Sequence, residues 1–172
     1  MSSETVTIIV NGTRRTASAA GHLTLLRWLR EQAGVTDPKY GCGEGVCGAC
    51  AVLVDGVPVA SCIVLAAQVS ECEVTTAAGL RGPDGSPGPL QRAFHRHHAA
   101  QCGFCTPGML ICATALLAEG KPLDREEIRE ALHGNICRCT GYGPIVSAIE
   151  SAQAELAEAA LAEGAGRAGE DQ

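Results

Sequence analysis

Aromatic side chains and long apolar runs are both scarce in this sequence. Phenylalanine, tyrosine and tryptophan make up only 3% of the 172 residues, so large side chains contribute little to any hydrophobic core. No apolar run approaches the roughly 20 residues that a membrane-spanning helix needs. The opening MSSETVTIIV also lacks the basic region and the long apolar segment of a secretory signal. We therefore expect a cytoplasmic protein with no membrane span.

Positive charge is likewise in short supply. The formal net charge is −6, and the 13 lysines and arginines are scattered rather than gathered in a stripe. Nucleic-acid-binding proteins usually carry a basic patch, so we expect no nucleic acid partner. Cysteine, by contrast, is abundant, with ten residues. Thiols stay reduced in the cytoplasm, so closely spaced cysteines there are typical of metal or redox sites rather than of disulfides.

The first half of the sequence has the pattern of a small β-sheet with one helix. An Asn-Gly pair at 11–12 and an Asp-Gly pair at 55–56 each separate two β-prone segments, and such pairs favour tight hairpin turns. Thr24 precedes apolar residues at helical spacing and can cap a short helix. We expect residues 4–80 to form this domain. The expected strands are 6–10, 13–18, 51–54, 57–60 and 72–76.

The second half has a helical pattern. Residues 81–89 are rich in glycine and proline and cannot sustain a helix or a strand ladder, so we expect a linker there. Beyond it the sequence predicts a helical domain over 90–162 and a disordered tail over 163–172. Thr106 before Pro107 is a typical helix start, with the threonine as N-cap. The expected helices are 90–99, 107–119, 125–133 and 144–161. The predicted fold class is thus α+β.

Four cysteines in the first half follow the spacing of a plant-type iron–sulfur site. Three of them form a CxxxxCxxC pattern, which is typical of a [2Fe–2S] cluster, and the fourth follows the 55–56 hairpin. The intervening glycines let the backbone curl closely round a cluster, where its N–H groups can hydrogen-bond to sulfur. The wide first gap and the glycines disfavour a structural zinc site. The predicted ligands are Cys42, Cys47, Cys50 and Cys62.

Four further cysteines form a CxxC pair and a CxC pair in the second half. Each pair is followed by a threonine and then by a predicted helix, so both pairs lie near helix N-termini, whose positive dipole end favours thiolates. Spacing alone leaves two possibilities open, because this combination can hold zinc as well as an iron–sulfur cluster. The predicted ligands are Cys102, Cys105, Cys137 and Cys139. Cys72 and Cys112 fall outside both sets, and we interpret them as structural.

Taken together, four segments resemble the small iron–sulfur subunit of the molybdenum hydroxylases, the family of xanthine oxidase, aldehyde oxidoreductase and aerobic carbon monoxide dehydrogenase. The segments are GCGEGVCGAC at 41–50, SC at 61–62, QCGFCTPG at 101–108 and GNICRCTGY at 134–142. The resemblance implies a ferredoxin-like β-grasp domain with the first cluster and an all-α four-helix domain with the second. It also favours a cluster over zinc at the second set.

The resemblance further implies a complex, either a heterotrimer or a dimer of heterotrimers. A large subunit would hold the molybdenum–pterin cofactor and hydroxylate the substrate with oxygen from water, and a medium subunit would hold FAD. Electrons would pass from molybdenum to the helical-domain cluster, then to the plant-type cluster and on to FAD. The resemblance also implies that Gln101 and Cys139 approach the pterin. The substrate site would belong to another chain, so this sequence does not specify the substrate.

Two other functions remain open at this point. One is a free-standing ferredoxin-type electron carrier, and the other is a zinc-stabilised interaction module. A lone carrier has no need of the helical half or of a pterin contact. A zinc module would lack the visible absorption of iron–sulfur thiolates.

Overall fold

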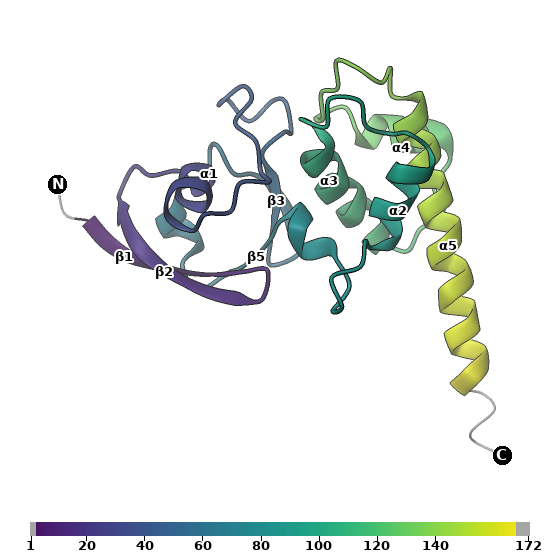
Figure 1. Ribbon diagram of the computed structural model, residues 1–172, viewed down its shortest axis with the longest axis horizontal. Helices are drawn as coiled ribbons and strands as arrows, with labels where there is room; N and C mark the ends of the chain where they lie inside the picture. Colours follow the sequence, from purple (N-terminus) through teal and green to yellow (C-terminus); the bar gives the residue numbers. More distant parts are fainter. Residues whose placement is uncertain (1–2, 168–172) are drawn as a thin grey trace.

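The computed structural model describes residues 3–167, and its first half is built on a five-stranded sheet (Figure 1). The strands lie in the order β2-β1-β5-β3-β4. Neighbouring strands are antiparallel except for β1 and β5, which are parallel, so the sheet is mixed. The strands are β1 Ser3–Val10, β2 Thr13–Ala20, β3 Ala51–Val54, β4 Val57–Ala60 and β5 Glu73–Thr75. Each of the five expected strands is present.

Both predicted hairpins are confirmed. Asn11 and Gly12 have φ values of 50° and 73°, and Asp55 and Gly56 have values of 49° and 83°. Two successive residues in the left-handed region are the mark of a type I′ turn, whose twist matches that of the flanking strands. The strand registers close directly on each two-residue turn, which fixes the face on which every strand residue lies.

The short helix of the first half is wound less regularly than the sequence predicts. Helix α1 spans Leu25–Arg27, with the hydroxyl of Thr24 accepting the N–H of Arg27 at 3.4 Å, and it continues as the π-helix η1, Trp28–Gln32. The N–H of Ala33 donates to the carbonyl of Trp28 at 3.0 Å, and a hydrogen bond between residues five apart defines a π-helical turn. Tertiary packing overrides local propensity here.

The core of the first half lies between the sheet and this helix. Val6, Ile8 and Val10 alternate along β1 and are buried, and they pack with Trp28 and Leu29. This alternation is the two-residue period of a strand with one covered face. Two short 3-10 helices, η2 Ala66–Val69 and η3 Ala77–Leu80, complete the connections around β5.

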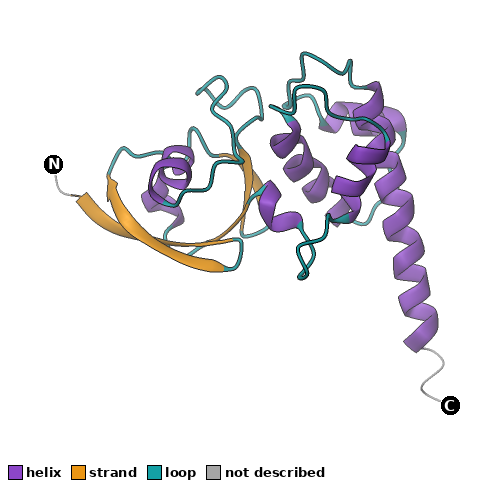
Figure 2. Cartoon of the chain, viewed as in Figure 1, coloured by secondary structure: helices purple, strands orange, loops and turns teal. Residues whose placement is uncertain are grey.

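The second half is helical, so the fold class is α+β, as predicted (Figure 2). The helices share one core, to which Leu90, Met109, Ile128 and Ile149 contribute, one from each helix. Among the helices within residues 3–167, none combines the length and the apolar character needed to cross a membrane. The helices are α2 Pro89–Arg96, α3 Thr106–Ala118, α4 Arg125–Ala131 and α5 Gly143–Arg167.

Helix α5 is longer than predicted. It continues past Leu161 to Arg167 and extends beyond the other helices (Figure 1). The described part of the predicted disordered tail, residues 163–167, is therefore helical, and residues 168–172 lie outside the described residues. The preceding segment is rich in alanine, leucine and glutamate, which have high helix propensity, and this outweighs the glycines that suggested an earlier end.

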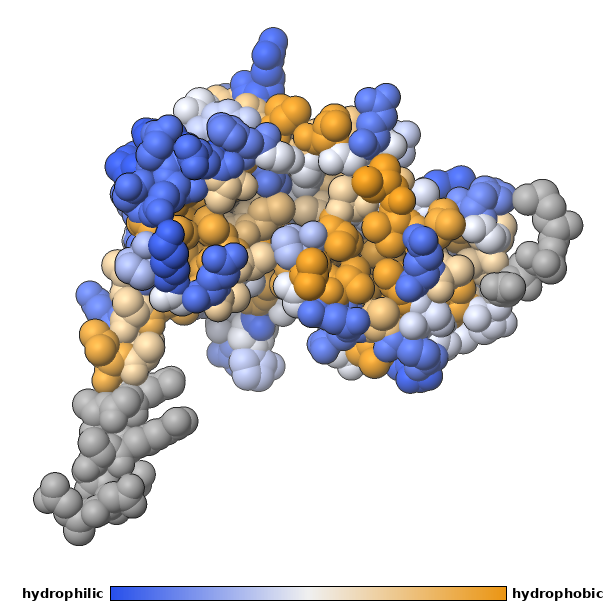
Figure 3. All heavy atoms as spheres, turned by 180° about the vertical axis from the view of Figure 1, so that it is seen from behind, coloured by the Kyte–Doolittle hydropathy of each residue, from blue (hydrophilic) through white to orange (hydrophobic). Residues whose placement is uncertain are grey.

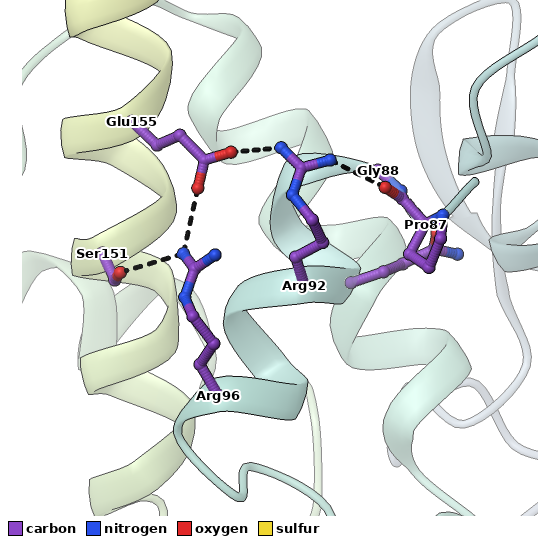
Figure 4. Close-up of polar contacts among 7 residues, drawn as sticks. Pro87, Gly88, Arg92, Arg96, Ser151 and Glu155 are labelled. Carbon is purple, nitrogen blue, oxygen red and sulfur yellow. Dashed lines mark hydrogen bonds and ion pairs between the residues drawn. The ribbon is translucent and has the colours of Figure 1, made fainter.

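Helices α2 and α5 are tied together by an arginine pair on one glutamate (Figure 4). The Glu155 carboxylate accepts hydrogen bonds from Arg92 and, at 2.9 Å, from Arg96. Arg92 also donates to the carbonyl of Pro87 at 2.8 Å, and Arg96 donates to the hydroxyl of Ser151 at 3.4 Å. The network therefore joins both helices to the segment that precedes α2.

Candidate metal centres

The first cysteine set lies in the loop before β3 and just after β4. The sulfurs approach one another in two pairs, Cys42 with Cys47 and Cys50 with Cys62. Cys50 and Cys62 are buried, whereas Cys42 and Cys47 are half-buried. The β3–β4 hairpin returns the chain to the loop, and the hydroxyl of Ser61 donates to the carbonyl of Cys50 at 2.6 Å. The hairpin thus brings the fourth thiol to the other three.

Glycines permit the tight course of this loop, as predicted. Gly43, Gly45 and Gly48 have φ values of 76°, 79° and 70°, which residues with a side chain rarely adopt. A Cβ on Gly41 would lie 2.8 Å from the sulfur of Cys47. The backbone can therefore turn its N–H groups toward the thiols without a side chain in the way.

In the first set, the surroundings lower the pKa of Cys42 and raise the pKa of Cys62. Backbone N–H groups of Glu44 and Val46 hold the pKa of Cys42 at about 6, because they donate to its sulfur; the Glu44 N–H lies 3.4 Å away. Burial, and then the neighbouring sulfur of Cys50, raises the pKa of Cys62 to about 11. Binding of iron to Cys62 must therefore displace its proton.

The second cysteine set brings together two loops of the helical half. The sulfurs of Cys102 and Cys139 are 3.5 Å apart, and Cys105 lies beside Cys137. Cys102 and Cys139 are exposed and Cys137 is buried. Burial, followed by the sulfur of Cys137, raises the pKa of Cys105 to about 12. The hydroxyl of Thr140 lies 3.1 Å from the sulfur of Cys137, within hydrogen-bond reach.

The predicted placement of this set at helix ends is correct for α3 and less direct for α5. Cys105 immediately precedes α3 and occupies the N-cap position expected for Thr106, which is instead the first helical residue. The hydroxyl of Thr106 is buried with no hydrogen-bond partner within the described chain, so it is free for an acceptor that the protein itself does not supply. On the other side, a turn ending at Tyr142 separates Cys139 from α5.

Tyr142 holds that turn in place. Its hydroxyl donates to the carbonyl of Asn135 at 3.1 Å and accepts the N–H of Cys137 at 2.9 Å. Its own N–H donates to the hydroxyl of Thr140 at 3.2 Å. Tyr142 therefore orders the backbone on both sides of the CxC pair, a role that no sequence pattern indicated.

The paired sulfurs fit the donor set of a [2Fe–2S] cluster. Such a cluster takes four cysteine thiolates, two on each of its two irons, and each set presents two pairs. Within residues 3–167, no three or more His, Cys, Asp or Glu side chains lie close enough to hold a single metal ion. The partnerless hydroxyl of Thr106, next to a cysteine of the second set, is also compatible with a cluster sulfide as acceptor.

The two sets meet where the halves of the molecule touch. The N–H of Ile136 donates to the carbonyl of Cys47 at 2.9 Å, so a residue adjacent to Cys137 is bonded to a cysteine of the first set. Helix α3 packs on β3, and a Cβ on Gly108 would lie 2.0 Å from the carbonyl oxygen of Gly48. Sequence reasoning did not find these contacts, because they join segments far apart in the chain.

The remaining predicted residues lie at both the surface and the interior. Gln101 is exposed, next to the exposed Cys102. Cys112 is half-buried on α3, where burial raises its pKa and the neighbouring Asn135 amide opposes that rise. Cys72 packs at the edge of the first core, and burial raises its pKa as well.

Two families of cluster-binding domain match successive parts of this chain. Residues 8–77 match the family described as "2Fe-2S iron-sulfur cluster binding domain", and residues 76–150 match the family described as "[2Fe-2S] binding domain". The chain is 48% identical to the nicotine 6-hydroxylase small subunit of Paenarthrobacter nicotinovorans over 151 residues, covering 88% of this chain and 90% of that protein. The chain belongs to the small iron–sulfur subunits of the molybdenum hydroxylase family.

Two further relatives have a similar length. The xanthine dehydrogenase iron-sulfur-binding subunit of Escherichia coli O157:H7 is 45% identical over 151 residues, covering 86% of this chain and 94% of that subunit. The structure of quinoline 2-oxidoreductase from Pseudomonas putida 86 matches with a TM-score of 0.87 and 43% identity, covering 92% of this chain and 98% of that chain. Family membership supports two [2Fe–2S] clusters and an electron-transfer role within an oxidoreductase complex.

Proposed function

We propose that this chain relays electrons between the other subunits of a molybdenum-containing hydroxylase or dehydrogenase. One cluster is held by Cys42, Cys47, Cys50 and Cys62, and the other by Cys102, Cys105, Cys137 and Cys139. The observation that carries the proposal is the hydrogen bond from Ile136 to Cys47, which joins the two sites by a short bonded route. A protein that merely used metal for stability would have no need of such a route.

We also propose the direction in which electrons pass along this route. Electrons enter at the helical-domain cluster from a molybdenum–pterin cofactor on a large subunit, pass to the plant-type cluster, and leave to FAD on a medium subunit. Gln101 and Cys139 contact the pterin. Both residues are exposed, which supports a surface that a partner can reach.

The surface around the plant-type cluster site, from which electrons would leave, is partly apolar. Val46 lies within the first cysteine loop and Ile63 follows Cys62, and they are 58% and 60% exposed. Figure 3 shows hydrophobic residues gathered over the half of the molecule that carries the sheet, while hydrophilic residues cover much of the helical half. Exposed apolar patches of this kind are typical of surfaces that partners cover, which supports contact with the FAD subunit there.

The domain organisation that we propose follows the two hydrophobic cores. Residues 4–80 form a β-grasp domain, residues 81–89 link it to the helical half, and residues 90–162 form a four-helix domain. The separate hydrophobic cores of the sheet half and the helical half support two domains, and Ala77 and Leu80 at the end of the first pack against the helical core. The complex is a heterotrimer or a dimer of heterotrimers in the cytoplasm, and its substrate is bound and hydroxylated on another chain.

The chain's own residues prepare the sites for one-electron chemistry, which the clusters supply when bound. Backbone N–H groups of Glu44 and Val46 stabilise the thiolate of Cys42, and the hydroxyl of Thr140 lies within hydrogen-bond reach of the sulfur of Cys137. Donors of this kind stabilise negative charge on sulfur and so tune a reduction potential. Burial of Cys50 and Cys137 keeps water from part of each site.

Metal and flavin analysis of the intact complex tests this function. We expect about four iron atoms per copy of this chain, since each cluster holds two, together with molybdenum and flavin on co-purifying subunits. Zinc in place of iron, in a colourless protein, would contradict the relay. Two clusters in a monomer that never captures a large partner would instead identify a free-standing carrier.

A further inference from the structure

Asn135 is a buried polar residue at the junction of the two cysteine sets. The residue is 4% exposed, and only Ser61 and Thr76 are comparably buried polar residues in the described part of the chain. Asn135 lies between α4 and Cys137, outside both ligand sets. A buried amide costs free energy unless its surroundings use it, so its position calls for a reason.

The side chain of Asn135 packs directly on the first cysteine loop. A Cβ on Gly48 would lie 2.4 Å from Nδ2 and 2.8 Å from Cγ of Asn135, so the amide rests on the Cα of Gly48. Cys112 of α3 lies beside the same amide, close enough for the amide to act on its thiol. The side chain therefore fills the space between the loop and α3.

The backbone of Asn135 is fixed to the helical half. Its N–H donates to the carbonyl of Leu132 at 2.8 Å, and its carbonyl accepts the hydroxyl of Tyr142 at 3.1 Å. The next residue, Ile136, is the one whose N–H donates to Cys47. Asn135 thus holds the helical segment through its backbone and the first loop through its side chain.

We propose that Asn135 is a positioning residue for electron transfer between the two clusters. Packed on Gly48, it keeps the N–H of Ile136 aimed at the carbonyl of Cys47. The bonded route then runs from the sulfur of Cys47 through its carbonyl, across the hydrogen bond, and along the backbone of Ile136 to Cys137. This inference rests on the proposed function and adds a residue to it that binds no iron.

The physical reason is the precision that such a route needs. Electron transfer falls off steeply with separation and is faster through bonds than across gaps. A site holds its geometry only when neighbouring side chains lock it. Without the amide on Gly48, the two loops could separate by a small distance that breaks the hydrogen bond and leaves each cluster intact.

The test compares Asn135→Ala with the unmodified chain, both loaded with clusters in the complex. We expect unchanged iron content and both cluster signals in spin resonance, but a smaller splitting from the magnetic interaction of the two reduced clusters. Amide hydrogen exchange should speed up at 134–136 and stay unchanged elsewhere. Asn135→Ser, a polar truncation less disruptive to folding, should give the same two changes. Asn135→Leu, which keeps the branched shape without adding a charge, should keep the native splitting.

The control is Thr76→Val, which removes a buried hydrogen bond, from Asn11 to Thr76, that involves neither cysteine set. Native splitting in Asn135→Ala or Asn135→Ser would overturn the proposal. So would an equal reduction in Thr76→Val, which would indicate general destabilisation, or an equal reduction in Asn135→Leu, which would exclude the packed shape of the side chain as the cause. A wild-type chain without two [2Fe–2S] signals would instead overturn the function on which the inference rests.

Discussion

The cysteines within each set differ in their exposure to solvent. Cys102 and Cys139 are exposed, whereas Cys50, Cys62 and Cys137 are buried. Desolvation is the main cause of the raised pKa of Cys62 and of the half-buried Cys105. The exposed pair faces outward at the surface where the proposed pterin contact lies. In the proposed ligand sets, the buried cysteines would anchor each cluster to the protein.

Single serine substitutions should separate the two clusters. Cys47→Ser is expected to remove one cluster signal in spin resonance of the reduced protein, and Cys105→Ser the other, because a serine hydroxyl is a far poorer ligand for iron than a thiolate. Cys112→Ser is the matched control, since Cys112 lies in neither set, and it should keep both signals. Loss of both signals from one ligand substitution, in a folded protein, would contradict separate sites.

Among the helices, the pairing of α2 with α5 depends on the carboxylate of Glu155. The hydrogen bond from Arg92 and then that from Arg96 lower the pKa of Glu155, so the folded chain favours the ionised form. Stabilisation from a lowered pKa is present above the ordinary glutamate value of about 4.3 and is lost as the pH falls through the lowered value. The side chains are partly exposed, which keeps the effect small.

Glu155→Gln should therefore unfold at a lower denaturant concentration than the wild type at pH 7. The difference between the two midpoints should narrow as the pH approaches 4 and falls below it, because the wild type then loses its charge as well. Denaturant unfolding, followed by circular dichroism at a series of pH values, measures this. Glu158→Gln, at an exposed glutamate of the same helix, serves as control. A difference independent of pH would exclude the ion pairs as its cause.

Elements set by local chemistry were predictable from the sequence, and elements set by packing were not. The Asn11-Gly12 turn was predicted because the turn residues themselves favour its dihedral angles. The π-helix at 28–32 was not, since it arises where buried residues meet the sheet. The cysteine pairs were found from spacing. Their connection through Ile136 was not, because nothing near Ile136 in the sequence indicates Cys47 as its partner.

At the scale of the whole molecule, the two halves are joined by backbone in close contact. The start of α3 presses on the first cysteine loop, and Gly108 and Gly48 leave room for no side chain between them. The segment around Asn135 closes the same junction from the other side. The separation of the two cysteine sets is therefore set by this junction rather than by the 81–89 connection.

Gly108→Ala should lower the free energy of unfolding, because the junction has no space for the added methyl group. The new Cβ would lie 2.0 Å from the carbonyl oxygen of Gly48, so the backbone must shift. Overpacking of this kind costs about 1–3 kcal/mol or more in unfolding free energy. Gly21→Ala is the matched control, because nothing lies within 4 Å of its Cβ position. Denaturant unfolding distinguishes them, and equal stability of both variants would contradict the close contact.

The same junction governs how chains of this kind can be recombined. A crossover in the 81–89 connection would exchange whole halves between relatives, yet the loop at Gly48 and the residues at 108 and 135 would then come from different parents. Those positions form a compatible set, since a larger residue on either side removes the space that the other needs. A chimera that folds and works should therefore take the loop at Gly48 and the residues at 108 and 135 from the same parent.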